Sequence, residues 1–247
     1  MYLTIQGIVL RVTDYNDKDA LLTLLTRRHG KLTVKARGLR RKNSPLTAPC
    51  QLLAYGEFTL FEYRGQYTIN EAHSIELFTA LRRDLTKLSL GTYFAQAAEV
   101  LSQEDLPSPE LQSLLLNCLF ALSKLDLPER LVKAVFELRS ACLSGYTPDL
   151  FGCHICGCQT PERFDLSAGQ LECRNCRSAD SNGIRMPVNP SVLEAMRYIC
   201  LCDPKKLFSF QIGEETMEKL ADLTEAYLTT QLERGFSTLD FYKSLLI

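Results

Sequence analysis

Histidine is scarce in this chain of 247 residues, and the common catalytic motifs are missing. With three histidines, few residues are available to act as the base in a Ser/His/Asp or Cys/His catalytic site. The sequence contains no phosphate-binding glycine-rich loop, no GxSxG and no HExxH, which mark nucleotide-binding enzymes, α/β-hydrolases and zinc proteases. We therefore expect a protein that is not an enzyme. A metal-dependent nuclease or a redox enzyme is the enzymatic alternative, and the sequence gives it little support.

Long apolar runs are also absent. No stretch of about 18 apolar residues exists, so no transmembrane helix is predicted. Residues 1–7 lack both the charged and the apolar region of a signal peptide. A free thiol within an apolar run behaves as a small hydrophobe, and five of the ten cysteines lie in such runs: Cys50, Cys118, Cys142, Cys200 and Cys202. We expect a protein of the reducing cytoplasm that does not bind membranes.

Net charge is almost absent, at −1, but the charges are unevenly distributed. Residues 1–50 hold ten Lys and Arg against three Asp, a local balance of +7. Residues 81–247 hold 17 basic and 22 acidic residues, a balance of −5. This asymmetry indicates a face near the N-terminus that binds a polyanion.

Residues 1–78 have the pattern of a small β domain. Five runs rich in β-branched and aliphatic residues are separated by turn signals such as His29-Gly30 and Arg64-Gly65. The runs are residues 3–12, 20–28, 31–37, 52–63 and 66–72. Five short strands in this length favour a closed barrel, most commonly an OB-fold, and an SH3-like barrel is the competing fold.

The third run alternates, with Leu32, Val34 and Ala36 on one face and polar or basic residues on the other. A basic loop follows at residues 38–45. Because Lys and Arg at this density hold phosphates without reading sequence, we predict a nucleic-acid site. An ordinary solvated face is the alternative. The predicted contacts are Lys31, Lys35, Arg37, Arg40, Arg41 and Lys42. Four aromatic residues are either stacking platforms for bases or barrel residues: Tyr15, Phe61, Tyr63 and Tyr67.

From about residue 80 the apolar residues recur with the period of a helix. Helices are expected up to about residue 101, then over 109–122, 131–142, 190–202, 214–234 and 239–246. Ser108 precedes a proline and is expected to cap the second of these, and Ser191 with Glu194 has the spacing of a capping box. The predicted architecture is α+β. Residues 79–149 and 186–247 form a helical domain, which residues 150–185 interrupt.

Two CxxC pairs, sixteen residues apart, lie in the interrupting segment. Paired CxxC turns are typical of a zinc ribbon, in which four thiolates surround one structural Zn²⁺. The predicted ligands are Cys153, Cys156, Cys173 and Cys176. A redox dithiol and a chance pairing are the alternatives. Cys158 could replace Cys156, and His154 lies between two of the ligands.

Several segments together resemble one known family. Residues 145–157 read Gly-Tyr-x-Pro-x-Leu-x-x-Cys-x-x-Cys-Gly, and residues 36–41 read Ala-Arg-Gly-Leu-Arg-Arg. Residues 7–11 read Gly-Ile-Val-Leu-Arg, followed by Asp-Ala-Leu-Leu-Thr at residues 19–23 and Gly-Lys-Leu at residues 30–32. In this order, they resemble RecO, a family of bacterial recombination mediators and DNA repair proteins, over essentially the whole chain.

The resemblance implies a mediator of recombinational repair in the bacterial cytoplasm, associated with the nucleoid. Such a protein binds single- and double-stranded DNA and anneals complementary strands. It associates with RecR and with the acidic, Phe-ended tail of the single-strand-binding protein, SSB, and so helps to load RecA onto coated DNA. Basic residues of the helical domain are available to rim a pocket for that tail: Arg82, Arg83, Lys87, Arg130, Lys133 and Arg139. The rival interpretation is a zinc-ribbon accessory factor in transcription or translation.

Overall fold

The computed structural model describes residues 1–125, 127–176 and 183–246. The chain divides into two compact units, which are described separately below. One consists of Met1–Asp126 together with Phe236–Ile247, and the other of Leu127–Gly235. The domain boundaries expected from the sequence separate a β domain, a helical domain and an inserted segment, and they remain a prediction. Residues 177–182 of the expected ribbon segment lie outside the described residues.

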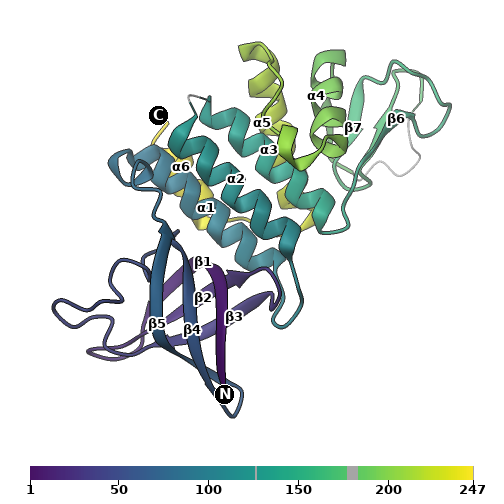
Figure 1. The fold of residues 1–247 in the computed structure, drawn as a ribbon. Coiled ribbons are helices and arrows are strands. Elements are labelled where there is room, and N and C mark those ends of the chain that lie inside the picture. The colour runs from purple at the N-terminus through teal and green to yellow at the C-terminus, as the bar shows by residue number, and fades with distance from the viewer. Residues whose placement is uncertain (126, 177–182, 247) are drawn as a thin grey trace. The chain divides into compact units, whose positions relative to one another are not determined.

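The first unit begins with a closed five-stranded barrel (Figure 1). Its strands are β1 (Tyr2–Asp14), β2 (Ala20–Thr26), β3 (Lys31–Ala36), β4 (Tyr55–Tyr63) and β5 (Gln66–Glu76). They are ordered β1-β2-β3-β5-β4, and β4 pairs with β1 to close the barrel. Only the β3–β5 pair is parallel. This is the predicted OB-fold and not the competing SH3-like barrel.

Alternating side chains fill the barrel interior. Along β3, Leu32, Val34 and Ala36 are buried, as their spacing predicts, and they pack with residues such as Phe58 and Leu60 of β4. Strand β1 pairs with β2 along one edge and with β4 along the other, and its register with β2 shifts between Val9 and Arg11, where a bulge bends the strand. β1 is also longer than the run of residues 3–12 that predicted it, because Thr13 and Asp14 still pair with β2.

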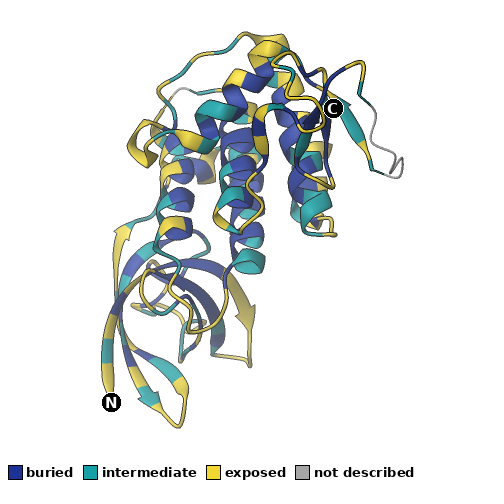
Figure 2. Cartoon of the chain, turned by 90° about the vertical axis from the view of Figure 1, so that its right-hand side faces the viewer, coloured by how far each residue is buried: buried dark blue, intermediate teal, exposed yellow. Residues whose placement is uncertain are grey.

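Three helices and a short turn complete the first unit. They are the 3₁₀ turn η1 (Leu81–Arg83), α1 (Leu85–Leu101), α2 (Pro109–Lys124) and α6 (Ser237–Ser244). Asp84 caps α1 by accepting hydrogen bonds from the backbone N–H groups of Thr86 and Lys87. Ser108 stands at the start of α2, as expected, but its hydroxyl donates to the Leu106 carbonyl and not into the helix. Figure 2 shows the buried residues along these helices in dark blue.

The second unit combines helices with a small sheet. Its helices are α3 (Glu129–Leu143), α4 (Pro190–Leu201), the 3₁₀ turn η2 (Pro204–Lys206) and α5 (Glu214–Gln231). Its strands are β6 (Asp149–Cys153), β7 (Arg163–Asp165), β8 (Gln170–Glu172) and β9 (Arg185–Pro187), in the order β6-β8-β7-β9. The capping box predicted at Ser191 is wrong, because Asn189 caps α4 by accepting from the N–H of Val192. None of the helices that the structure describes has the length and apolarity to cross a lipid bilayer.

A buried group of charges joins α3 to α5. The Lys133 ammonium contacts a carboxylate oxygen of Glu137 at 3.0 Å and one of Glu225 at 2.7 Å. Thr224 donates a hydrogen bond to Glu137 at 2.9 Å. Burial raises the pKa of Glu137, and Lys133 opposes that rise. The charged groups of the cluster are thus paired with one another, as buried charges require.

Candidate metal centre and nucleic-acid interface

The structure brings four cysteine thiols together where strands β6 and β8 of the small sheet end. The Sγ atoms of Cys153, Cys156, Cys173 and Cys176 all lie within 4.8 Å of one another. Cys156 and Cys173 have their sulfurs 3.7 Å apart. Sulfurs arranged tetrahedrally around a zinc ion at about 2.3 Å would be separated by about 3.8 Å. The four thiols could therefore hold a metal ion.

Local turns aim the thiols at one point. Cys153 ends β6, and its carbonyl accepts a hydrogen bond from Gly157 at 2.7 Å, closing the first CxxC turn. Gly157 has a φ of +72°, where a side chain would be strained. Cys173 directly follows β8, and the second turn closes with a hydrogen bond from the Cys176 N–H to its carbonyl at 3.3 Å.

An arginine that the sequence did not single out supports the second turn. Arg163 of β7 donates from Nη2 to the carbonyls of Cys173 at 3.0 Å and Cys176 at 3.2 Å. The pairing of β7 with β8 places its side chain there. The residue was missed because nothing in its neighbourhood in the sequence indicates a contact across the hairpin.

The thiols have widely separated pKa values, as expected of a crowded set of ionisable groups. Although burial alone would raise it, hydrogen bonds from backbone N–H groups lower the pKa of Cys153 to about 6. The neighbouring side chains of Cys156 and Cys173 raise the pKa of Cys176 to about 12. Four thiolates cannot gather without a countercharge, and a bound cation would supply one.

The two alternative ligands lie outside this group of four. The sulfur of Cys158 lies 3.2 Å from the Thr160 hydroxyl. The Nδ1 atom of His154 lies 3.1 Å from the Leu171 carbonyl oxygen. Both side chains thus have other polar neighbours, and the cluster is formed by the four predicted cysteines.

Of the six predicted phosphate contacts, three are engaged within the first unit. Lys31 donates from Nζ to the Glu99 carbonyl at 3.0 Å. Lys35 lies 3.4 Å from Asp19 and sits over the ring of Tyr15. Arg40 lies 3.2 Å from Asp14. The carboxylates of Asp19 and Asp14 offset part of the positive charge that the sequence places on this face.

The remaining three, Arg37, Arg41 and Lys42, are exposed on the loop between β3 and β4. That loop is anchored to the barrel, because Asp19 accepts a hydrogen bond from the Gly38 N–H at 2.8 Å. The same bond is the main cause of the lowered pKa of Asp19. The anchored loop holds three cations toward solvent, where phosphates could reach them.

The four aromatic residues predicted as stacking platforms or barrel residues differ in their exposure. Tyr15, Phe61 and Tyr63 are exposed, but Lys35 lies over one face of the Tyr15 ring and Arg64 over that of Tyr63, so only part of each ring could stack on a base. Tyr67 packs against the barrel core. The ring of Phe61 also contacts that of Tyr2, with centroids 5.4 Å apart.

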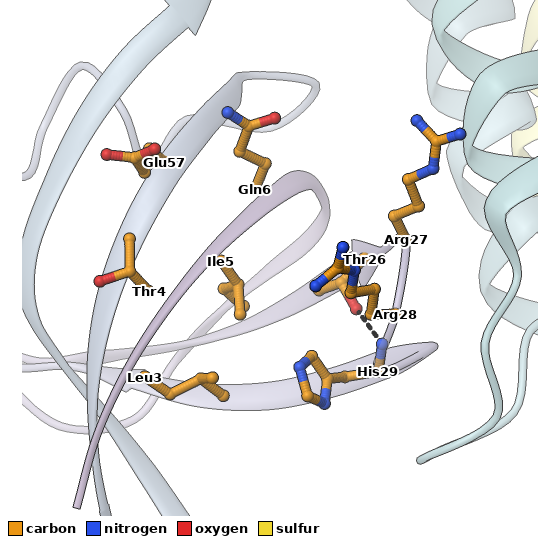
Figure 3. Close-up of a pocket in the computed structure, with 9 residues that line it drawn as sticks. All are labelled: Leu3, Thr4, Ile5, Gln6, Thr26, Arg27, Arg28, His29 and Glu57. Carbon is orange, nitrogen blue, oxygen red and sulfur yellow. Dashed lines mark hydrogen bonds between the residues drawn. The ribbon is translucent and has the colours of Figure 1, made fainter.

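A second basic group lies in the turn between β2 and β3. It was not identified from the sequence, because this segment was interpreted only as a turn. Arg27 and Arg28 are exposed there, and His29 is half-buried. The turn borders a hollow of about 410 Å³ against β1 (Figure 3). The adjacent pair of arginines was the available signal.

The chain combines an OB-fold barrel, which carries an exposed cationic loop, with a four-cysteine module that could hold a metal. This combination defines the class of protein as a modular OB-fold protein. Two family models match it: recombination protein O N terminal over residues 1–78, and recombination protein O C terminal over residues 82–240. The chain therefore belongs to the RecO family.

Similar proteins extend the match over nearly the whole chain. The DNA repair protein RecO of Acetivibrio thermocellus is 32% identical, covering 99% of this chain and 97% of its own length. That of Alkaliphilus metalliredigens is 30% identical, covering 99% of this chain and 100% of its own. That of Desulforudis audaxviator is 32% identical, with 97% and 96% covered. The family supports a role in DNA repair.

Proposed function

We propose that this protein is a cytoplasmic, non-enzymatic mediator of recombinational repair. It binds and anneals single-stranded DNA and, with RecR, helps to load RecA onto DNA coated with SSB. The main support is the loop that Asp19 anchors, which presents Arg37, Arg41 and Lys42 to solvent. Annealing brings two polyanions together, and fixed cations lower that repulsion without a catalytic group.

The annealing of two complementary oligonucleotides tests this proposal. Reversing Arg37 and Arg41 to Glu should slow annealing and reduce the salt dependence of DNA binding. Lys124→Glu, an exposed cation at the end of α2, is the matched control and should leave both unchanged. Equal annealing by the Arg37/Arg41 variant and the unmodified protein would remove the loop from the site. A preference for RNA over DNA would favour the rival accessory factor in transcription or translation.

We propose Zn²⁺ as the metal of the four-cysteine site, because four thiolates at tetrahedral spacing suit zinc. It would brace the small sheet without taking part in a reaction. Metal analysis of protein purified without chelators should find one zinc per chain. Cys173→Ser should lose it, whereas Cys118→Ser, a buried thiol of α2, should keep it.

A groove beside α4 suits the acidic, Phe-ended SSB tail that the family resemblance implies. It has a volume of about 780 Å³, and apolar residues such as Leu201 and Phe210 line it beside Lys206 and the Arg197–Glu194 ion pair. None of the basic residues suggested from the sequence lines it. Lys133 is buried in the ion cluster, and Arg139 donates to backbone carbonyls at the end of α4. An SSB-tail peptide should bind less tightly to Leu201→Glu, and unchanged binding would exclude this groove.

A further inference from the structure

Strand β1 has an edge that is not covered by another strand of the described residues. Residues 2–6 pair with β4 only, because the pairing of β1 with β2 begins at Gly7, opposite Thr26. Met1 and Glu62 exchange two backbone hydrogen bonds, of 3.0 and 2.8 Å. In an antiparallel ladder, alternate residues turn their N–H and C=O groups to the other edge. Tyr2 and Thr4 therefore direct these groups away from β4.

A hollow of about 410 Å³ lies along this open edge. Leu3 and Ile5 contribute its apolar lining, and the β2–β3 turn contributes Arg28 and His29 opposite them (Figure 3). An extended chain could thus lie against both backbone groups and apolar side chains.

The turn on the far side of the hollow is held in one conformation. The hydroxyl of Thr26 accepts from the His29 N–H at 3.0 Å, and the Thr26 N–H donates to the Gly30 carbonyl at 2.8 Å. Gly30 has a φ of +58°, and a Cβ there would collide with the carbonyls of Gln103 and Leu106. Arg27 and Arg28 are therefore presented from a fixed backbone, which reduces the entropy lost when they bind a partner.

Charge and hydrogen bonding together define the occupant. The lining carries two arginines, Arg27 and Arg28, against one acid, Glu57, so a negatively charged partner is favoured. The open edge presents both N–H and C=O groups. A peptide backbone satisfies both kinds, whereas a phosphodiester offers acceptors only. A second copy of this chain, pairing edge to edge, would bring its own Arg27 and Arg28 against the same cations.

We propose that the open edge of β1 binds an extended acidic segment of a partner protein as an added strand. The partner backbone pairs with Tyr2 and Thr4, and its carboxylates meet Arg27 and Arg28. Its apolar side chains lie over Leu3 and Ile5. This is strand addition, in which the main chain provides affinity and alternate side chains provide specificity. The surface is distinct from the loop proposed to hold DNA.

A fluorescein-labelled peptide of alternating Glu and Val, measured by fluorescence anisotropy with the full chain, tests the proposal. The parent peptide should bind, and N-methylation of alternate amides should weaken binding at least about tenfold, because it removes strand donors. The Arg27→Glu/Arg28→Glu variant should weaken binding to a similar extent. Lys124→Glu, on α2, is the matched control and should bind normally.

Amide shifts in nuclear magnetic resonance spectra should change at Tyr2 and Thr4, and thermal melting should show that the variants remain folded. The proposal is overturned if the parent peptide does not bind, or if its N-methylated form binds equally well. It is also overturned if the arginine variant, shown to be folded, binds normally. Competition by an oligonucleotide that depends on the same arginines would assign the edge to nucleic acid instead. If the unmodified protein forms a dimer and the arginine variant does not, the open edge of β1 would be assigned to pairing with a second copy of this chain.

Discussion

The ammonium group of Lys31 donates a hydrogen bond to the backbone carbonyl of Glu99, at 3.0 Å. This carbonyl lies in the last turn of α1, where the helix leaves acceptors unsatisfied and carries partial negative charge. Arg11 of β1 pairs with the carboxylate of the same residue at 2.9 Å. Two barrel cations that could contribute to a DNA-binding face are thus used to join β1 and β3 to α1.

Lys31→Met should therefore reduce stability more than DNA binding. Loss of the contact with a helix end should lower the free energy of unfolding by about 1 kcal/mol. Affinity for single-stranded DNA should change less than about twofold, since the ammonium is already engaged. Urea unfolding and fluorescence anisotropy with a labelled oligonucleotide measure the two effects.

Arg41→Ala/Lys42→Ala should give the opposite result. Both residues are exposed on the β3–β4 loop, so unfolding should be almost unaffected. If both cations hold phosphates, the slope of log affinity against log salt should become shallower by about 1.4, or about 0.7 for each contact with single-stranded DNA. A larger loss of DNA affinity in Lys31→Met than in this variant would contradict the assignment.

Arg163→Ala should weaken metal binding without removing a ligand. The side chain fixes the carbonyls of Cys173 and Cys176, and residues that orient metal ligands typically affect affinity by about 10- to 100-fold. Competition with a chromogenic zinc chelator measures the change. Arg174→Ala is the control, because the exposed Arg174 lies in the same turn but contributes only its backbone carbonyl to the contact. Equal zinc affinity for Arg163→Ala and the unmodified protein would show that the turn needs no such support.

The sequence predicted those features that depend on local periodicity. Alternation in β3 marked the barrel interior, and the CxxC spacing marked four thiols that the structure brings together. Contacts between distant residues were not predictable, such as Lys31 with Glu99 or Arg163 with the second CxxC turn. Local chemistry was also misinterpreted at the start of α4. Proline favours the first position of a helix, so Pro190 indicated Asn189 as the cap, and Ser191 already lies within the first turn.

Lys133→Met should strongly destabilise the second unit. It would leave Glu137 and Glu225 close together without their shared cation. Breaking a buried ion pair from one side costs about 3–5 kcal/mol. Lys133→Met/Glu137→Leu should recover much of that loss, since an apolar pair needs no countercharge. Urea unfolding of the single and double variants measures both changes. A double variant no more stable than Lys133→Met would show that the pair is not the source of the cost.

Cys142 should be alkylated at lower pH than an ordinary thiol. Its sulfur lies 3.5 Å from that of Cys200, and the interaction with Cys200, assisted by Thr147 and Arg139, lowers the pKa of Cys142. Because the thiolate is the reactive form, the curve of alkylation rate against pH should be displaced to lower pH. Burial raises the pKa of Cys50 to about 12, so Cys50 should react slowly in the folded protein and serves as the internal control. Cys200→Ala removes this partner and should return the Cys142 curve toward higher pH. Rates for each cysteine can be followed with iodoacetamide and peptide mass spectrometry, and an unshifted curve in Cys200→Ala would show that the Cys200 thiol does not stabilise the Cys142 thiolate.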